Sequence, residues 1–209
     1  MPSSLLQRLA SRNAILPSMG VLTAAIALVA WIAPSDKTLG DMVKMVYVHG
    51  AVIRITLLTF VLSGALGIAY LPTGRAAWHD WSQALARTGL ALWIVYVVVS
   101  AIATIQTWGG IPAFEPRWIF TFQVLVIAPI FHLVGAWLKN PRIAALLNAA
   151  LGALILYLLS QARLIMHPID PIGQATTDSV RVAYAILLML CGLFAAQLAR
   201  GIRQLAASR

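Results

Sequence analysis

Residues 43–71, VKMVYVHGAVIRITLLTFVLSGALGIAYL, decide the fold class of this chain. Lys44 and Arg54 carry the only charged side chains in the stretch. A helix needs about 20 mostly apolar residues to cross the hydrocarbon core of a bilayer, and this stretch exceeds that length. The sequence therefore predicts a membrane-spanning helix that tilts or projects beyond the bilayer.

The rest of the chain has the same character. Of its 209 residues, 61% are hydrophobic and only 10% are charged, and the mean hydropathy is +0.87. A soluble domain typically carries about 25% charged residues, so lipid must be the solvent for most of this surface. We expect one all-α domain over residues 1–209, a polytopic membrane protein with six transmembrane helices. The expected spans are residues 14–33, 43–71, 85–107, 118–138, 141–164 and 178–198.

The basic residues predict the orientation of these spans. Nine of them fall on the side that holds both termini, and five fall on the other side together with five of the six acids. The nine are Arg8, Arg12, Arg75, Arg87, Lys139, Arg142, Arg200, Arg203 and Arg209, and the five are Lys37, Lys44, Arg117, Arg163 and Arg181. The positive-inside rule then puts both termini in the cytoplasm. The same scatter argues against a nucleic-acid partner despite the net charge of +9.

Two histidines fall on the predicted outer side. His49 lies near the outer start of the second span, and His167 lies in the last outer loop. A neutral imidazole is a ligand for metals and for haem iron, so the two could hold an iron porphyrin from both faces. The alternative is that each is an ordinary polar residue at the membrane interface. Cys191 is the only cysteine, which excludes an internal disulfide and a CxxCH motif for covalent haem.

Three arginines are candidates for binding an anionic group such as a haem propionate: Arg54, Arg117 and Arg163. Arg54 lies five residues past His49 inside the span, and its alternative role is to snorkel outward or to hydrogen-bond a neighbouring helix. Arg117 and Arg163 flank the outer loops, and each has an acid nearby as an alternative partner, Glu115 or Asp170.

Aromatic residues surround the second outer loop. Trp108, Phe114 and Trp118 could stack on a porphyrin, or they could anchor helix ends in the interface, which is the role we expect for Trp118. His79, in the WHDW segment between the second and third spans, and His132, in the inner half of the fourth, could hold a second haem, but a loop histidine beside an acid is usually just solvated. The Gly64/Gly67 pair favours close helix packing.

This arrangement resembles the haem-handling cytochrome c assembly family, specifically haem exporter protein C, the six-helix component of the system I cytochrome c maturation machinery. That family has a histidine near the outer start of the second helix, in a context like YIHVP, where this chain has YVHG at residues 47–50. It has a second histidine after the fifth helix, where this chain has His167. The resemblance covers about residues 42–170.

The family's tryptophan-rich outer loop, of the form WGTWWVWDARLT, aligns without a gap with residues 108–119, WGGIPAFEPRWI. Trp108, Gly109 and Arg117 match, and Phe114 and Glu115 are conservative counterparts of a Trp and an Asp. The loop is divergent, because Ile111 and Pro112 stand where the family has two tryptophans. Gly50 stands where the family has a proline, and Arg54 has no counterpart.

The resemblance implies a protein that binds haem b non-covalently at the outer face of a bacterial cytoplasmic membrane. His49 and His167 would ligate the iron, the loop around Trp108 would cover the porphyrin edge, and Arg117 or Arg163 would neutralise propionates. The partners it implies, besides haem and membrane lipid, are an outer-side haem chaperone and an ABC-type exporter. No bond chemistry is required, so the chain is not expected to be an enzyme.

Two other readings stay open at this stage. One is a b-type cytochrome anchor subunit of a respiratory complex, in which haem stays bound and moves electrons. The other is a small-solute permease or structural subunit that binds no haem. The absorption spectrum of the purified protein, oxidised and reduced, separates the haem-binding readings from the colourless one, and a stable haem with a reversible redox midpoint and co-purifying redox subunits favours the cytochrome anchor.

Overall fold

The computed structural model of the chain describes residues 12–37, 39–163, 166 and 178–207. Within these residues there are six helices long and apolar enough to cross a membrane, and no strand. After a short 3-10 turn, η1 (Arg12–Ala14), they are α2 (Ile15–Ile32), α3 (Val43–Thr73), α4 (Ala76–Trp108), α5 (Pro116–Leu138), α6 (Pro141–Gln161) and α7 (Asp178–Ala207). The predicted all-α architecture with six spans is confirmed, whereas the cytoplasmic position of the termini stays a prediction.

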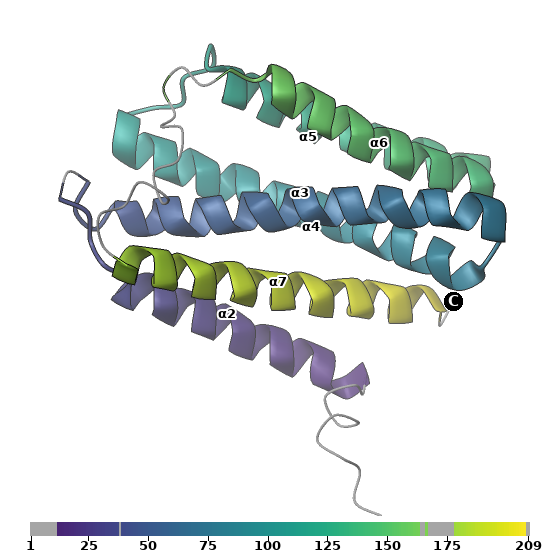
Figure 1. Ribbon diagram of the computed structural model, residues 1–209, viewed down its shortest axis with the longest axis horizontal. Helices are drawn as coiled ribbons and strands as arrows, with labels where there is room; N and C mark the ends of the chain where they lie inside the picture. Colours follow the sequence, from purple (N-terminus) through teal and green to yellow (C-terminus); the bar gives the residue numbers. More distant parts are fainter. Residues whose placement is uncertain (1–11, 38, 164–165, 167–177, 208–209) are drawn as a thin grey trace, which may run out of the picture.

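The helices form three antiparallel pairs along one common axis (Figure 1). α3 and α4 make the most extensive contact and lie in the middle, with α5 and α6 on one side and α2 and α7 on the other. α2 is the least buried span and packs mainly on α7. Because the chain reverses at each connection, the starts of α3, α5 and α7 lie at one end of the bundle, which the charge distribution predicts to be the outer end.

Two helices extend about nine residues beyond their predicted ends. α4 begins at Ala76 rather than near residue 85, so the WHDW segment predicted as a loop is helical, and α7 continues to Ala207 rather than ending near residue 198. α3 also continues through Pro72 to Thr73 and ends at Gly74, whose φ of 61° is left-handed. Hydropathy marks only the part of a helix that contacts lipid, and a helix can extend beyond the bilayer with polar residues.

The contact between α3 and α6 depends on glycines. A Cβ atom at Gly67 would lie 2.6 Å from the carbonyl oxygen of Ala145, and one at Gly64 would lie 3.1 Å from that of Asn148. On α6, a Cβ at Gly152 would lie 3.2 Å from the carbonyl oxygen of Phe60. Small residues let helix backbones approach closely. This close packing matters in a membrane, because lipid is as apolar as the side chains and no hydrophobic force draws the helices together. The packing role predicted for Gly64 and Gly67 is confirmed.

A buried polar cluster lies beside this contact. Ser63 and Ser82 each donate a side-chain hydrogen bond to the other's carbonyl oxygen at 2.8 Å, which joins α3 to α4. Nδ2 of Asn148 on α6 donates to Oγ of Ser82 at 2.9 Å. Three helices are therefore connected by side chains whose polar atoms are satisfied within the apolar bundle.

Candidate functional site

His49 lies in the second turn of α3, with its side chain half-buried. Its ring packs against the ring of Tyr96 on α4, with 5.3 Å between ring centroids and 31° between ring planes. Its Nδ1 atom is buried. The predicted ligand is therefore a partly accessible imidazole at the α3–α4 contact, near the end of the bundle where α3 begins.

Tyr96 connects His49 to the beginning of α5. Its hydroxyl lies 3.1 Å from Oγ1 of Thr121, whose own proton is donated to the carbonyl oxygen of Arg117 at 2.7 Å. Tyr96 must therefore be the donor in its bond to Thr121, because a threonine hydroxyl has one proton. The charge of Arg117 also acts on the Tyr96 hydroxyl.

The Tyr96 ring packs on Trp93, which in turn packs on Phe120. The ring of Trp93, fully buried one turn earlier on α4, lies 5.0 Å from that of Tyr96 and 5.5 Å from that of Phe120. Nε1 of Trp93 donates to the carbonyl oxygen of Thr121 at 3.2 Å. These residues were missed in the sequence analysis. The signal that could have found them is the helical spacing of Trp93, Tyr96 and Ser100, a row of polar-tipped side chains inside an apolar span.

Glu115 joins the loop that follows α4 to the segment that follows α6. It is the residue before the first turn of α5, and its side chain is fully buried. Its Oε2 atom accepts a hydrogen bond at 3.3 Å from the backbone N–H of Met166, the residue that precedes His167. The segment that leads to His167 is therefore held at the start of α5, the same helix that Tyr96 contacts.

His167, the second predicted iron ligand, lies outside the described residues, as does Asp170, the predicted alternative partner of Arg163. The His49–His167 pair is thus a prediction that these contacts leave open. Within the described residues no group of three or more His, Cys, Asp or Glu side chains could hold a metal ion. A haem iron with two histidine ligands would not form such a group, so that finding does not bear on it.

Arg54 lies on a different side of α3 from His49. Its guanidinium carbon is 5.0 Å from the centre of the Tyr184 ring on α7, and the side chain is exposed on the bundle surface. Gly50, one turn earlier, faces the same tyrosine, since a Cβ there would lie 3.3 Å from the Tyr184 hydroxyl oxygen. The structure thus brings Arg54 to a buried tyrosine on α7, while His49 faces Tyr96 on α4.

The other predicted residues differ in burial. Arg117 is half-buried, and its Nε atom is buried with no hydrogen-bond partner within the described part of the chain. Arg163 and Phe114 are exposed, and Trp108 is half-buried at the end of α4. Trp118 is only 2% exposed and lies against Phe122, so the prediction that it anchors α5 in the membrane interface is wrong. A ring enclosed by the protein cannot contact lipid headgroups.

The remaining two histidines are not brought together by any contact among the described residues. His79, which is in a helix and not in a loop, lies 5.3 Å from the Tyr70 ring and 3.7 Å from a carboxylate oxygen of Asp80. His132 lies on α5 with Nδ1 3.1 Å from the carbonyl oxygen of Ala128 in its own helix. Nothing in these contacts supports a second haem between them.

The fold defines the class of this molecule as a multi-pass α-helical membrane protein. Comparison with protein-family models and with curated protein sequences found no match for the chain. The case for any more specific function therefore depends on the residues around His49 and the outer loops.

Proposed function

We propose that this protein binds haem b non-covalently at the outer face of a bacterial cytoplasmic membrane, with His49 as one axial ligand and His167 as the other. In the role that the family resemblance suggests, it holds haem for an outer-side chaperone, next to an ABC-type exporter, and catalyses no reaction. Bound haem would supply the iron, and the chain's own residues would supply imidazole ligands, a cation for propionates and cover against water.

One observation carries this proposal: two chains of contacts meet on the first turns of α5. His49 reaches α5 through Tyr96 and Thr121, and the segment before His167 reaches it through Met166 and Glu115. Thr121 is six residues past Glu115, which is roughly 9 Å along a helix. Both chains of contacts thus end on one short region of α5, which supports a shared site for the two histidines.

The residues around this region fit an anionic, planar, largely apolar ligand. Arg117 is half-buried in the first turn of α5 and has a buried Nε atom without a hydrogen-bond partner among the described residues. A guanidinium in such a place suits a carboxylate, which it binds in a bidentate manner. Trp108 and Phe114 lie on the same outer loop and offer aromatic surface.

The test is the absorption spectrum of the purified full-length protein, oxidised and reduced, for the native chain and for four histidine variants. His49→Ala and His167→Ala should each lose the low-spin spectrum of a bis-histidine haem, and added imidazole should partly restore it. His79→Ala and His132→Ala are the matched controls and should keep it. Colourless native protein with an intact helical fold would contradict the proposal and favour the permease or structural reading.

Three further measurements separate haem handling from electron transfer: the redox midpoint of the haem, the subunits that co-purify, and the transfer of haem to another protein. A haem that remains through purification, shows a reversible redox midpoint and comes with redox subunits would indicate a b-type cytochrome anchor. Transfer of the haem to the apo form of a soluble haem-binding protein, within the time of the experiment, would support delivery to a chaperone.

A further inference from the structure

Gln123 is an exposed amide inside a membrane-spanning helix. It is seven residues past Pro116, the first residue of α5, which is roughly 10 Å along the helix axis. The hydrocarbon core of a bilayer is about 30 Å thick, so this position lies within it if α5 spans the membrane. A primary amide that faces lipid has two donors and an acceptor without partners, and each costs free energy there.

Threonine hydroxyls inside the spans are satisfied by their own helices. The hydroxyls of Thr56 and Thr88, for example, donate to the carbonyl oxygens four residues earlier in their own helices, at 2.7 and 2.8 Å. Gln123 makes no hydrogen bond with any described residue. Gln106, which is also exposed, lies two residues before the end of α4, where water at the interface can reach it.

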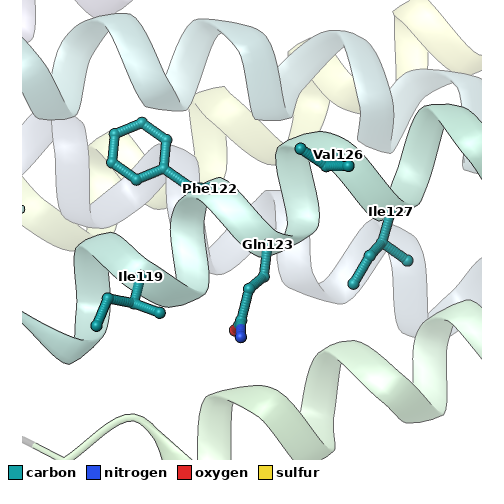
Figure 2. A pocket seen from close by; sticks show the side chains of 5 residues that line it. All are labelled: Ile119, Phe122, Gln123, Val126 and Ile127. Carbon is teal, nitrogen blue, oxygen red and sulfur yellow. The ribbon is translucent and has the colours of Figure 1, made fainter.

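The surface around Gln123 is a shallow, open hollow lined by α5 alone. Figure 2 shows Ile119, Gln123 and Ile127 leaving α5 on one edge, and Phe122 and Val126 leaving it on the other. Together they line an open hollow of about 460 Å³. Rows of side chains spaced four residues apart are the ridges between which a second helix packs.

A continuous row of exposed side chains runs along this face of α5. We call this row the outward seam of α5. Its spacing alternates between four and three residues, as in helices that pack side by side with a left-handed crossing. Its members, all exposed, are Ile119, Gln123, Val126, Ile130, Leu133 and Trp137. Gln123 is the one polar member of this row.

We propose that the outward seam of α5 packs against the same seam of a second copy of this protein, with the two Gln123 amides hydrogen-bonded to one another. All copies have the same orientation in the membrane, because the same charges set it, so a two-fold axis must run along the membrane normal. Residues near that axis then meet their own counterparts at equal depth. An amide is both donor and acceptor, so a glutamine is complementary to itself, whereas a lipid acyl chain offers it no partner.

The position of the interface is tested by cysteine cross-linking in native membranes, using the full chain with Cys191 replaced by Ala. Val126→Cys, on the seam, should form a disulfide-linked dimer on oxidation. Ala150→Cys, exposed on α6 at a similar depth, is the control and should not. Equal cross-linking at both positions, no dimer at Val126→Cys, or adducts only with a different protein would overturn the proposal.

The role of the amide is tested by the dimer dissociation constant of the purified protein in lipid, measured by energy transfer between labelled copies. Gln123→Leu should raise the constant roughly 3- to 30-fold, the usual effect of losing a polar contact between transmembrane helices. Gln123→Asn should retain part of the affinity, and Gln106→Leu should leave it unchanged. A monomeric native protein, or a Gln123→Leu variant with native affinity, would overturn the proposal. Neither test depends on haem, so a failure of the proposed function would leave both results unaffected.

Discussion

The carboxylate of Glu115 accepts a hydrogen bond from the backbone N–H of Met166 at 3.3 Å, which ties the start of α5 to the segment that leads to His167. The carboxylate is fully buried although it sits in a loop. A buried acid needs compensating hydrogen bonds, so we expect the fold to depend on this contact.

We expect Glu115→Ala to weaken haem binding roughly fivefold, because it removes the acceptor of a partly buried hydrogen bond that contributes about 1 kcal/mol. Glu115→Gln keeps an acceptor oxygen and should lose less. Haem affinity is measured by titration of the purified protein. Asp178→Ala, which removes an exposed outer-side carboxylate paired with Arg181, is the control. Equal haem affinity in the native and Glu115→Ala proteins would show that the contact does not position a haem ligand.

Arg54 is expected to stabilise the α3–α7 contact and not to bind a propionate. Its guanidinium already lies over the Tyr184 ring, on a side of α3 that His49 does not face. We therefore expect Arg54→Leu to lower stability by about 0.5–2 kcal/mol, the range of a cation–π contact, with haem content unchanged. Haem per protein and unfolding in detergent are measured together. Loss of haem in Arg54→Leu but not in Arg54→Lys would instead support the propionate role.

Gly67 is expected to tolerate no side chain. Since a Cβ there would lie 2.6 Å from a backbone oxygen of α6, Gly67→Ala must push two helices apart, at a cost of about 1–3 kcal/mol. Gly20→Ala is the matched control, because no atom lies within 4 Å of its added Cβ, and it should be neutral or slightly stabilising. Unfolding in mixed detergent micelles measures both, and a Gly67→Ala protein as stable as the native one would contradict the close α3–α6 contact.

The orientation of the bundle is tested by labelling intact cells with an impermeant thiol reagent after Cys191 is replaced. Cysteines introduced at Gly110 and at Gly173, in the second and third outer loops, should react, and one at Gly74, between α3 and α4, should not. These expectations follow from the division of the basic residues. Labelling at Gly74 alone would reverse the orientation and place His49 on the cytoplasmic side.

Hydropathy predicted six spans correctly because lipid contact demands long apolar runs, and the part of the chain that the structure describes has six helices of that kind. It predicted the lengths of α4 and α7 less well, since both helices continue into more polar residues, over 76–84 in α4 and 199–207 in α7. It also identified Gly64 and Gly67 as a packing pair, although their partner helix, α6, could not be read from the sequence.

The sequence alone determined the membrane class, the spans and the position of His49 near one end of α3, because each depends only on local composition and order. Only the tertiary structure decided what each side chain faces. It placed His49 against Tyr96, Arg54 over Tyr184 and Trp118 inside the protein, and it left Gln123 on the outside. The reason is that a span that is apolar on all sides gives no signal of its rotation about its own axis, and that rotation is set by how neighbouring helices pack.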